Sequence, residues 1–160
     1  LALFGGFISV HVLGLYEPAM EAHRTLFFFT PLIAAMAGNV GVQSSAIIVQ
    51  GIANNALSGS LVKRLMKELT LSLLNVSILA LILIVGSHFL LNIDYLTGIT
   101  VALALLSVII TASLIGTFIP ILLDKYGVDP ALATGPFITT SNDILGIIIF
   151  FSIAKVILGF

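Results

Sequence analysis

The sequence predicts an all-α integral membrane protein built as a bundle of five transmembrane helices. Of its 160 residues, 59% are hydrophobic and only 8% are charged, whereas a soluble domain carries about 25% charged residues. Five apolar stretches approach or exceed the ~20 residues that cross a bilayer as a helix, and short connections between them hold most of the charges. A β-barrel would need alternating strands of about ten residues, and these stretches do not alternate.

The five helices are expected at roughly residues 1–16, 25–53, 65–91, 95–123 and 130–160, in one membrane domain covering residues 1–160. Because the chain begins inside an apolar run, without Met or a basic segment, we expect upstream sequence to be missing rather than a signal peptide. Lys63, Arg64 and Lys67 follow the second stretch, so the positive-inside rule puts that connection in the cytoplasm. Counting helices from there puts the N-terminal side in the cytoplasm and the C-terminus outside. We therefore expect a multi-pass protein of the cell (inner) membrane, surrounded by lipid.

Charge and composition exclude several function classes. The net charge of −1 gives no basic surface for nucleic acid. The absence of cysteine excludes disulfides, thiol nucleophiles and thiolate metal sites. No nucleophile–base pattern is present, so we do not expect an enzyme.

The third and fourth stretches resemble ordinary packing helices. Their hydroxyl residues, such as Ser72, Ser107 and Thr111, are expected to bond a backbone carbonyl one turn back along the same helix. We therefore expect these hydroxyl residues to have a structural role.

The fifth stretch combines apolar residues with a polar stripe. Gly135 and Pro136 predict a kink or a short unwinding within it. At 100° per residue one face carries a stripe, formed by Pro136, Thr139, Thr140, Asp143 and Gly146. Asp129 precedes Asp143 by about four turns, or roughly 21 Å, so we expect it near the same face.

The second stretch carries a matching stripe of amides. Asn39, Gln43, Ala46 and Gln50 share one face, and Gly38 and Gly41 flank Asn39 below Pro31. Glycines at this spacing let another backbone approach, or let carbonyls leave the helical ladder. Two interrupted helices with polar stripes predict a pathway between them. The alternative is that Asn39 and Gln43 only hold helices together.

Asp143 gives the strongest indication of transport. A carboxylate near the bilayer centre costs about 2.5–3.5 kcal/mol, and no Lys or Arg lies at a similar depth. Such an acid needs a mobile cation, a proton or water. Hydroxyl, amide and carboxylate oxygens are hard ligands that suit Mg²⁺, Ca²⁺ or Mn²⁺. A two-fold homodimer would supply two carboxylates, and so few of them leave most coordination to water, which suits Mg²⁺.

At these same residues the sequence resembles the MgtE family of magnesium channels, in its membrane domain. The matching motifs are "PLIAAMAGNVGVQSSAIIVQGIA" in the second stretch and "DPALATGPFITTSNDILGIIIFF" in the fifth. The resemblance implies a homodimeric pore lined by the second and fifth helices of both subunits. It implies hydrated Mg²⁺ held at Asp143 with the turn at Thr139, Asp129 near the cytoplasmic mouth, and Asn39 on the pore wall. The remaining pore-lining residues would be Gly38, Gly41, Gln43, Pro136, Thr140 and Gly146.

The predicted function is therefore a divalent-cation channel or transporter, with Mg²⁺ as the first candidate ion. Two alternatives stay open. A carrier could exchange Mg²⁺ for Na⁺ or protons, with Asp143 as a protonation switch. A scaffold subunit could use the polar stripes only to hold helices together.

Overall fold

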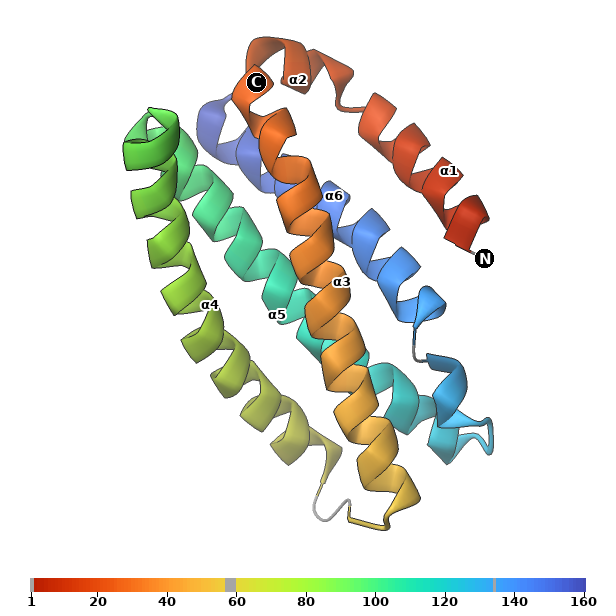
Figure 1. Ribbon diagram of the computed structural model, residues 1–160. Helices are drawn as coiled ribbons and strands as arrows, with labels where there is room; N and C mark the ends of the chain where they lie inside the picture. The colour runs from red at the N-terminus through yellow and green to blue at the C-terminus, as the bar shows by residue number, and fades with distance from the viewer. Residues whose placement is uncertain (1, 57–59, 134) are drawn as a thin grey trace.

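The computed structural model describes residues 2–56, 60–133 and 135–160, and within them every regular element is a helix (Figure 1). The elements are α1 (Ala2–Gly14), α2 (Glu17–Ala22), α3 (Arg24–Ala53), α4 (Leu61–Leu91), α5 (Tyr95–Lys125), the 3₁₀ helix η1 (Pro130–Ala133) and α6 (Pro136–Leu158). This confirms the all-α class, and it confirms the predicted second, third and fourth helices to within a few residues.

Four of these helices are long and apolar enough to cross a bilayer: α3, α4, α5 and α6. The first predicted span is represented by α1, which has 13 residues. At 1.5 Å per residue α1 covers about 20 Å, less than the ~30 Å of a bilayer's hydrocarbon core. The described residues therefore give four candidate spans, and the fifth crossing stays a prediction.

The hairpin between α4 and α5 shows how local sequence sets helix ends. Asn92 takes a left-handed conformation, with φ of 52°, and ends α4. Two residues later the Asp94 carboxylate accepts the backbone N–H of Thr97 at 2.9 Å and so caps the start of α5. The same hydrogen bond lowers the pKa of Asp94 from its ordinary value, because it stabilises the charged form.

The expected interruption of the second span is wrong, because α3 is one unbroken helix through Pro31, Gly38 and Gly41. Pro31 removes only one backbone donor, and α3 packs along both α5 and α6, which supports its helical path. Gly38 and Gly41 are buried in those contacts. Their missing side chains allow neighbouring helices to approach closely, and they do not unwind the helix.

The fifth predicted helix divides into two elements. Gly135 has φ of 67° and precedes the first residue of α6, Pro136. Glycine tolerates this left-handed backbone, and proline suits the first helical turn because no intrahelical partner awaits its missing N–H. The break expected near Pro136 is thus confirmed. The expectation that Asp129 and Asp143 share one helical face over four turns is wrong, because Asp129 precedes η1, outside α6.

Helix α5 lies at the centre of the bundle and contacts α3, α4 and α6. Its buried apolar side chains pack with others from α3, α4 and α6, among them Ile33, Val76, Leu105, Ile109, Phe150 and Phe151. On the far side of α6, α1 is held by Tyr16, whose ring stacks on that of Phe151 with centroids 4.9 Å apart. This arrangement leaves one side of α3 and α6 uncovered by α5.

Hydroxyl groups in α4 and α5 behave in two ways. Ser107 donates to the Leu103 carbonyl at 3.0 Å and Thr111 to the Ser107 carbonyl at 2.8 Å, which confirms the expected bonds within α5. The same expectation is wrong for Ser72. Its hydroxyl donates to Ser113 Oγ of α5 at 2.6 Å, because Ser72 and Ser113 are both buried where the two helices meet.

Helices α3 and α5 approach each other closely at two glycines. A side chain at Gly116 would overlap with the backbone carbonyl of Gly41 and would lie 3.1 Å from Ser44 Cβ. Backbone atoms cannot move aside as a flexible side chain can. The separation of α3 and α5 at this level therefore depends on a glycine at position 116.

We expect Gly116→Ala to lower the free energy of unfolding by about 1–3 kcal/mol, as is usual for overpacking, and so to lower the melting temperature. Gly86→Ala in α4 is the matched control, because nothing lies within 4 Å of a side chain added there. Thermal unfolding in detergent, followed by circular dichroism, measures both variants. Equal melting temperatures for the two variants would contradict the proposed contact.

Candidate functional site

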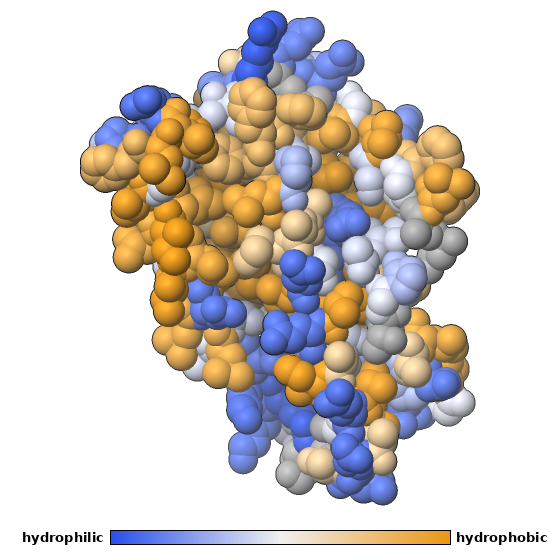
Figure 2. Space-filling model, in the orientation of Figure 1, coloured by the Kyte–Doolittle hydropathy of each residue, from blue (hydrophilic) through white to orange (hydrophobic). Residues whose placement is uncertain are grey.

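A groove of about 460 Å³ lies between α3 and α6 and holds half of the predicted site residues. Asp143 and Thr139 of α6 line one side, facing a wall of small and amide residues of α3: Ala34, Ala35, Gly38, Asn39, Val42, Gln43 and Ala46. Hydrophilic residues gather at the lower end of the molecule and run up over α3 through a largely hydrophobic surface (Figure 2). The groove therefore offers carboxylate, hydroxyl and amide oxygens within a membrane helix bundle.

Gly38 lies opposite the two polar residues of α6. A side-chain carbon at this position would lie 3.3 Å from Thr139 Cγ2 and 3.7 Å from Asp143 Oδ1. The first distance is shorter than an ordinary van der Waals contact, so any larger residue would displace Thr139 or fill the space beside the carboxylate. The lack of a side chain at Gly38 keeps this part of the groove open.

Thr139 is oriented by the start of its own helix. Its backbone N–H and its hydroxyl both donate to the carbonyl of Gly135, at 3.0 and 3.1 Å. The hydroxyl proton is thus engaged, and the oxygen lone pairs remain free to accept from water. Donation to Gly135 makes the Thr139 hydroxyl an acceptor toward the groove, as a site for a hydrated cation requires.

A second hollow of about 420 Å³ adjoins the groove on the side of α1. It is lined by Gly5, Gly6, Gly135, Pro136, Thr139, Thr140 and Asp143. Thr139 and Asp143 line both hollows, so the carboxylate lies between them. The break before α6 and the groove of α3 thus share one acidic group.

The structure brings together Asp143, Thr139, Asn39, Gly38 and Gln43, as the two sequence stripes indicate. Pro136 and Thr140 lie in the adjoining hollow. Helical periodicity was sufficient here, because each stripe lies on one continuous helix and the two helices pack side by side.

Gly41 and Gly146 lie in helix contacts, outside both hollows. Gly41 is buried against Asn142 and Gly116, and Gly146 faces Val108, Ala37 and Ile33. Gly146 belongs to the predicted stripe of the fifth stretch, and Gly41 is expected on the pore wall from the family resemblance. The direction of each residue around its helix decides whether it faces the groove or a neighbouring helix.

Asp129 also lies outside both hollows. It is exposed, and its carboxylate accepts the backbone N–H of Ala131 at 2.9 Å, at the start of η1. The structure thus places this acid at the end of the bundle where α6 begins. Among the described residues, no three His, Cys, Asp or Glu side chains gather as a metal cage.

Sequence reasoning missed Asn142, the neighbour of Asp143. Its side chain is 2% exposed, and Nδ2 donates to the Ala37 carbonyl of α3 at 3.3 Å. Asn142 is 100° away from Asp143 around α6, so it lies off the polar stripe. An amide directly beside the carboxylate of a membrane-spanning helix was the signal that could have identified it.

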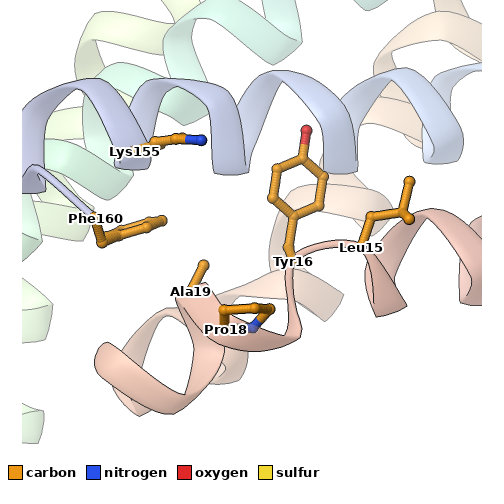
Figure 3. Close-up of a pocket in the computed structure, with 6 residues that line it drawn as sticks. All are labelled: Leu15, Tyr16, Pro18, Ala19, Lys155 and Phe160. Atoms are coloured by element: carbon orange, nitrogen blue, oxygen red, sulfur yellow. The ribbon is translucent and has the colours of Figure 1, made fainter.

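A further hollow, of about 260 Å³, lies at the other end of α6. Leu15, Tyr16, Pro18 and Ala19, from the corner between α1 and α2, face Lys155 and Phe160 across it (Figure 3). Its walls are mainly apolar, and among the described residues that line it only Lys155 carries a charge. A positive charge repels cations, so the groove at Asp143 is the candidate cation site.

Comparison with known proteins identifies relatives along the chain. The family model named MgtE, described as a divalent cation transporter, matches residues 30–153. The magnesium transporter MgtE of Bacillus subtilis is 36% identical over 96% of this chain and 34% of its own length. Those of Enterococcus faecalis and Thermus thermophilus are 35% and 30% identical, each over 99% of this chain and 35% of their own length.

This chain thus spans about a third of the length of the curated relatives that it matches. The family model covers every residue named above as lining the groove, from Ala34 to Asp143. The family is one of transporters and not of enzymes, in agreement with the prediction from the residues. The chain belongs to the MgtE family of divalent cation transporters.

Proposed function

We propose that this chain is the membrane pore domain of a Mg²⁺ transporter, and that the groove between α3 and α6 forms one half of the pore. The observation that carries the proposal is the position of Asp143. Its carboxylate shares the groove with Thr139 and Gly38, beside the amides of Asn39 and Gln43. Membership in a family of divalent cation transporters supports the same ion class.

The groove suits an ion that keeps its water shell. A volume of about 460 Å³ is large beside the ~30 Å³ that one water molecule occupies in the liquid. Mg²⁺ dehydrates reluctantly and is held through few carboxylates and several waters. Asp143, with Thr139 and Asn39, would therefore bind the hydrated ion through its waters.

A second copy of the chain would complete the pore. The groove is open on the side away from α5, where Asn39 and Gln43 are exposed, and one chain supplies a single carboxylate to it. Two chains related by a two-fold axis would place two carboxylates around one divalent charge. In this assembly α1 would cross the membrane as well, and this would bring the number of crossings to five. The N-terminal side would lie in the cytoplasm and the C-terminus outside.

Asp129 would act at the cytoplasmic mouth of this pore. It is exposed near the break that precedes α6, and Lys63 and Lys67 lie on α4, whose first turns the positive-inside rule assigns to the cytoplasm. A carboxylate at the mouth would raise the local concentration of divalent cations there. Its role is thus separate from that of Asp143.

We expect Asp143→Asn to abolish nearly all Mg²⁺ influx into liposomes, because it keeps the shape of the side chain and removes the charge. Asp94→Asn is the matched control. It makes the same substitution at a helix cap outside the groove, where Asn caps as well as Asp. Fluorescent Mg²⁺ indicators inside the liposomes report the flux. Influx through Asp143→Asn equal to that of the parent would show that Asp143 is not the ion site, whereas the absence of influx through the parent itself would favour the scaffold function.

The same assay separates a channel from an exchanger. Parent liposomes are measured with and without an imposed Na⁺ or pH gradient. A channel gives Mg²⁺ influx that follows the Mg²⁺ gradient and the membrane potential alone. Influx that requires a Na⁺ or proton gradient would establish the exchanger instead.

Gly38→Ala should reduce Mg²⁺ influx severalfold while the protein still folds. The added methyl group would lie 3.3 Å from Thr139 Cγ2 and 3.7 Å from Asp143 Oδ1, in the space that the hydrated ion needs. Gly86→Ala has open space around it and should conduct as the parent does. If both variants conduct equally, Gly38 does not border the ion path.

Cross-linking tests the paired assembly. The sequence holds no cysteine, so Ala35→Cys introduces the only thiol of this chain, on the rim of the groove. We expect oxidant-induced dimers in membranes for this variant. Ile78→Cys on the exposed side of α4 should stay monomeric on denaturing gels. Equal cross-linking of both variants, or of neither, would contradict the proposed axis.

A further inference from the structure

Asn142 joins the two helices that carry the candidate site. Its Nδ2 donates to the Ala37 carbonyl at 3.3 Å, and the side chain is 2% exposed. Ala37 directly precedes Gly38, and Asn142 directly precedes Asp143. The hydrogen bond therefore joins the residue before Gly38 to the residue before Asp143, and Gly38 and Asp143 face each other across the groove.

The backbone of α3 provides a fitted surface for this amide. A side chain at Gly41 would overlap with Nδ2 of Asn142 and would lie 3.1 Å from its Cγ. The Gly41 backbone also contacts Gly116 of α5. The amide thus rests on a part of α3 that packs against α5 as well, and this limits how far α3 can move.

A contribution to stability does not by itself explain why position 142 carries an amide side chain. Its Oδ1 is buried and has no hydrogen-bond partner among the described residues, and an unpaired buried acceptor lowers stability. The bond that Nδ2 makes, at 3.3 Å, is longer than the usual 2.9–3.0 Å. An apolar residue of similar shape would remove the weak bond and the unpaired acceptor together.

We propose that Asn142 is a positioning residue for the ion, which fixes the rotation and height of α6 against α3. This inference rests on the proposed function. Asn142 itself faces α3 and does not line the groove. Neighbouring residues of a helix are separated by 100°, so Asn142 and Asp143 turn together when α6 rotates about its axis. Such a rotation would move the Asp143 carboxylate relative to Gly38 on the opposite wall of the groove. The amide holds the carboxylate at one distance from the wall of α3.

A positioning role has a different consequence from a packing role. Residues that orient a metal ligand, without touching the metal, change metal affinity by roughly ten- to hundredfold when they are replaced. Residues that only pack change the thermal stability and leave the affinity unaltered. The two roles are therefore separated by measuring ion binding and melting temperature on the same variants.

The experiment uses the intact protein, with Mn²⁺ as a hard, paramagnetic probe of the site. Asn142→Leu removes the donor and keeps the approximate shape, and Asn142→Ala removes it without any risk of overpacking. Binding in detergent is followed by the electron paramagnetic resonance signal of Mn²⁺. Asp143→Asn gives the background binding of a protein that lacks the site. We expect both Asn142 variants to bind Mn²⁺ roughly ten- to hundredfold more weakly, to need more Mg²⁺ for half-maximal influx, and to melt near the parent temperature.

Ser113→Ala is the matched control. It removes another buried inter-helix hydrogen bond, between Ser72 and Ser113, which joins α4 to α5 outside the groove. We expect this variant to melt at a lower temperature and to keep the parent's Mn²⁺ affinity. Its behaviour shows what the loss of a buried bond does without a change at the site.

Parent-like Mn²⁺ affinity in both Asn142 variants overturns the inference, as does an equal loss of affinity in Ser113→Ala. Failure of both Asn142 variants to fold assigns the residue to stability and overturns it as well. If the parent protein shows no Asp143-dependent Mn²⁺ binding or Mg²⁺ influx, the proposed function fails and this inference with it. The parent measurement thus distinguishes the two failures.

Discussion

At Gly41 the backbone of α3 contacts two helices at once, through Gly116 of α5 and Asn142 of α6. A membrane helix bundle has no hydrophobic driving force between its helices, because lipid is as apolar as the side chains. Close packing and inter-helix hydrogen bonds must therefore supply the specificity. This crossing offers both, in a glycine contact and in the bond from Asn142 to Ala37.

The position of the acidic group follows from this crossing. Gly38 lies one turn before Gly41, and Asp143 follows Asn142, so the same approach of α3 to α6 brings Gly38 within reach of the carboxylate. Because α5 covers the opposite side of α3, the polar residues Asn39 and Gln43 are left on the open side. A carboxylate that would be costly in hydrocarbon thus lies in a groove with other oxygen donors.

The break before α6 serves the same groove from its other end. Gly135 and Pro136 start a new helix, so the Gly135 carbonyl accepts from both the N–H and the hydroxyl of Thr139. A helix continued through this point would have placed Thr139 at a different angle from α3. The short η1 helix and the exposed Asp129 lie before the break, and this separates the two acids that the sequence stripe had joined.

The sequence by itself determined the helical class, the positions of α3, α4 and α5, and the polar residues that line the groove. Those features depend on hydrophobic length and on a period of 3.6 residues, which are local properties of a chain. The same reasoning placed Asp143 with Thr139, and Asn39 with Gln43, because each pair lies on one helix. It also placed a backbone break at Gly135 and Pro136, from the conformational limits of those two residues.

Only the tertiary structure decided which helix neighbours each polar or small residue. Gly41, Gly146 and Asn142 face other helices, Ser72 bonds α5 instead of its own backbone, and α3 stays helical through Pro31. These outcomes depend on inter-helix distances and on rotations of a few tens of degrees, which periodicity does not fix. The physical reason is that packing partners lie far apart in the chain, so their contacts are set by the bundle as a whole.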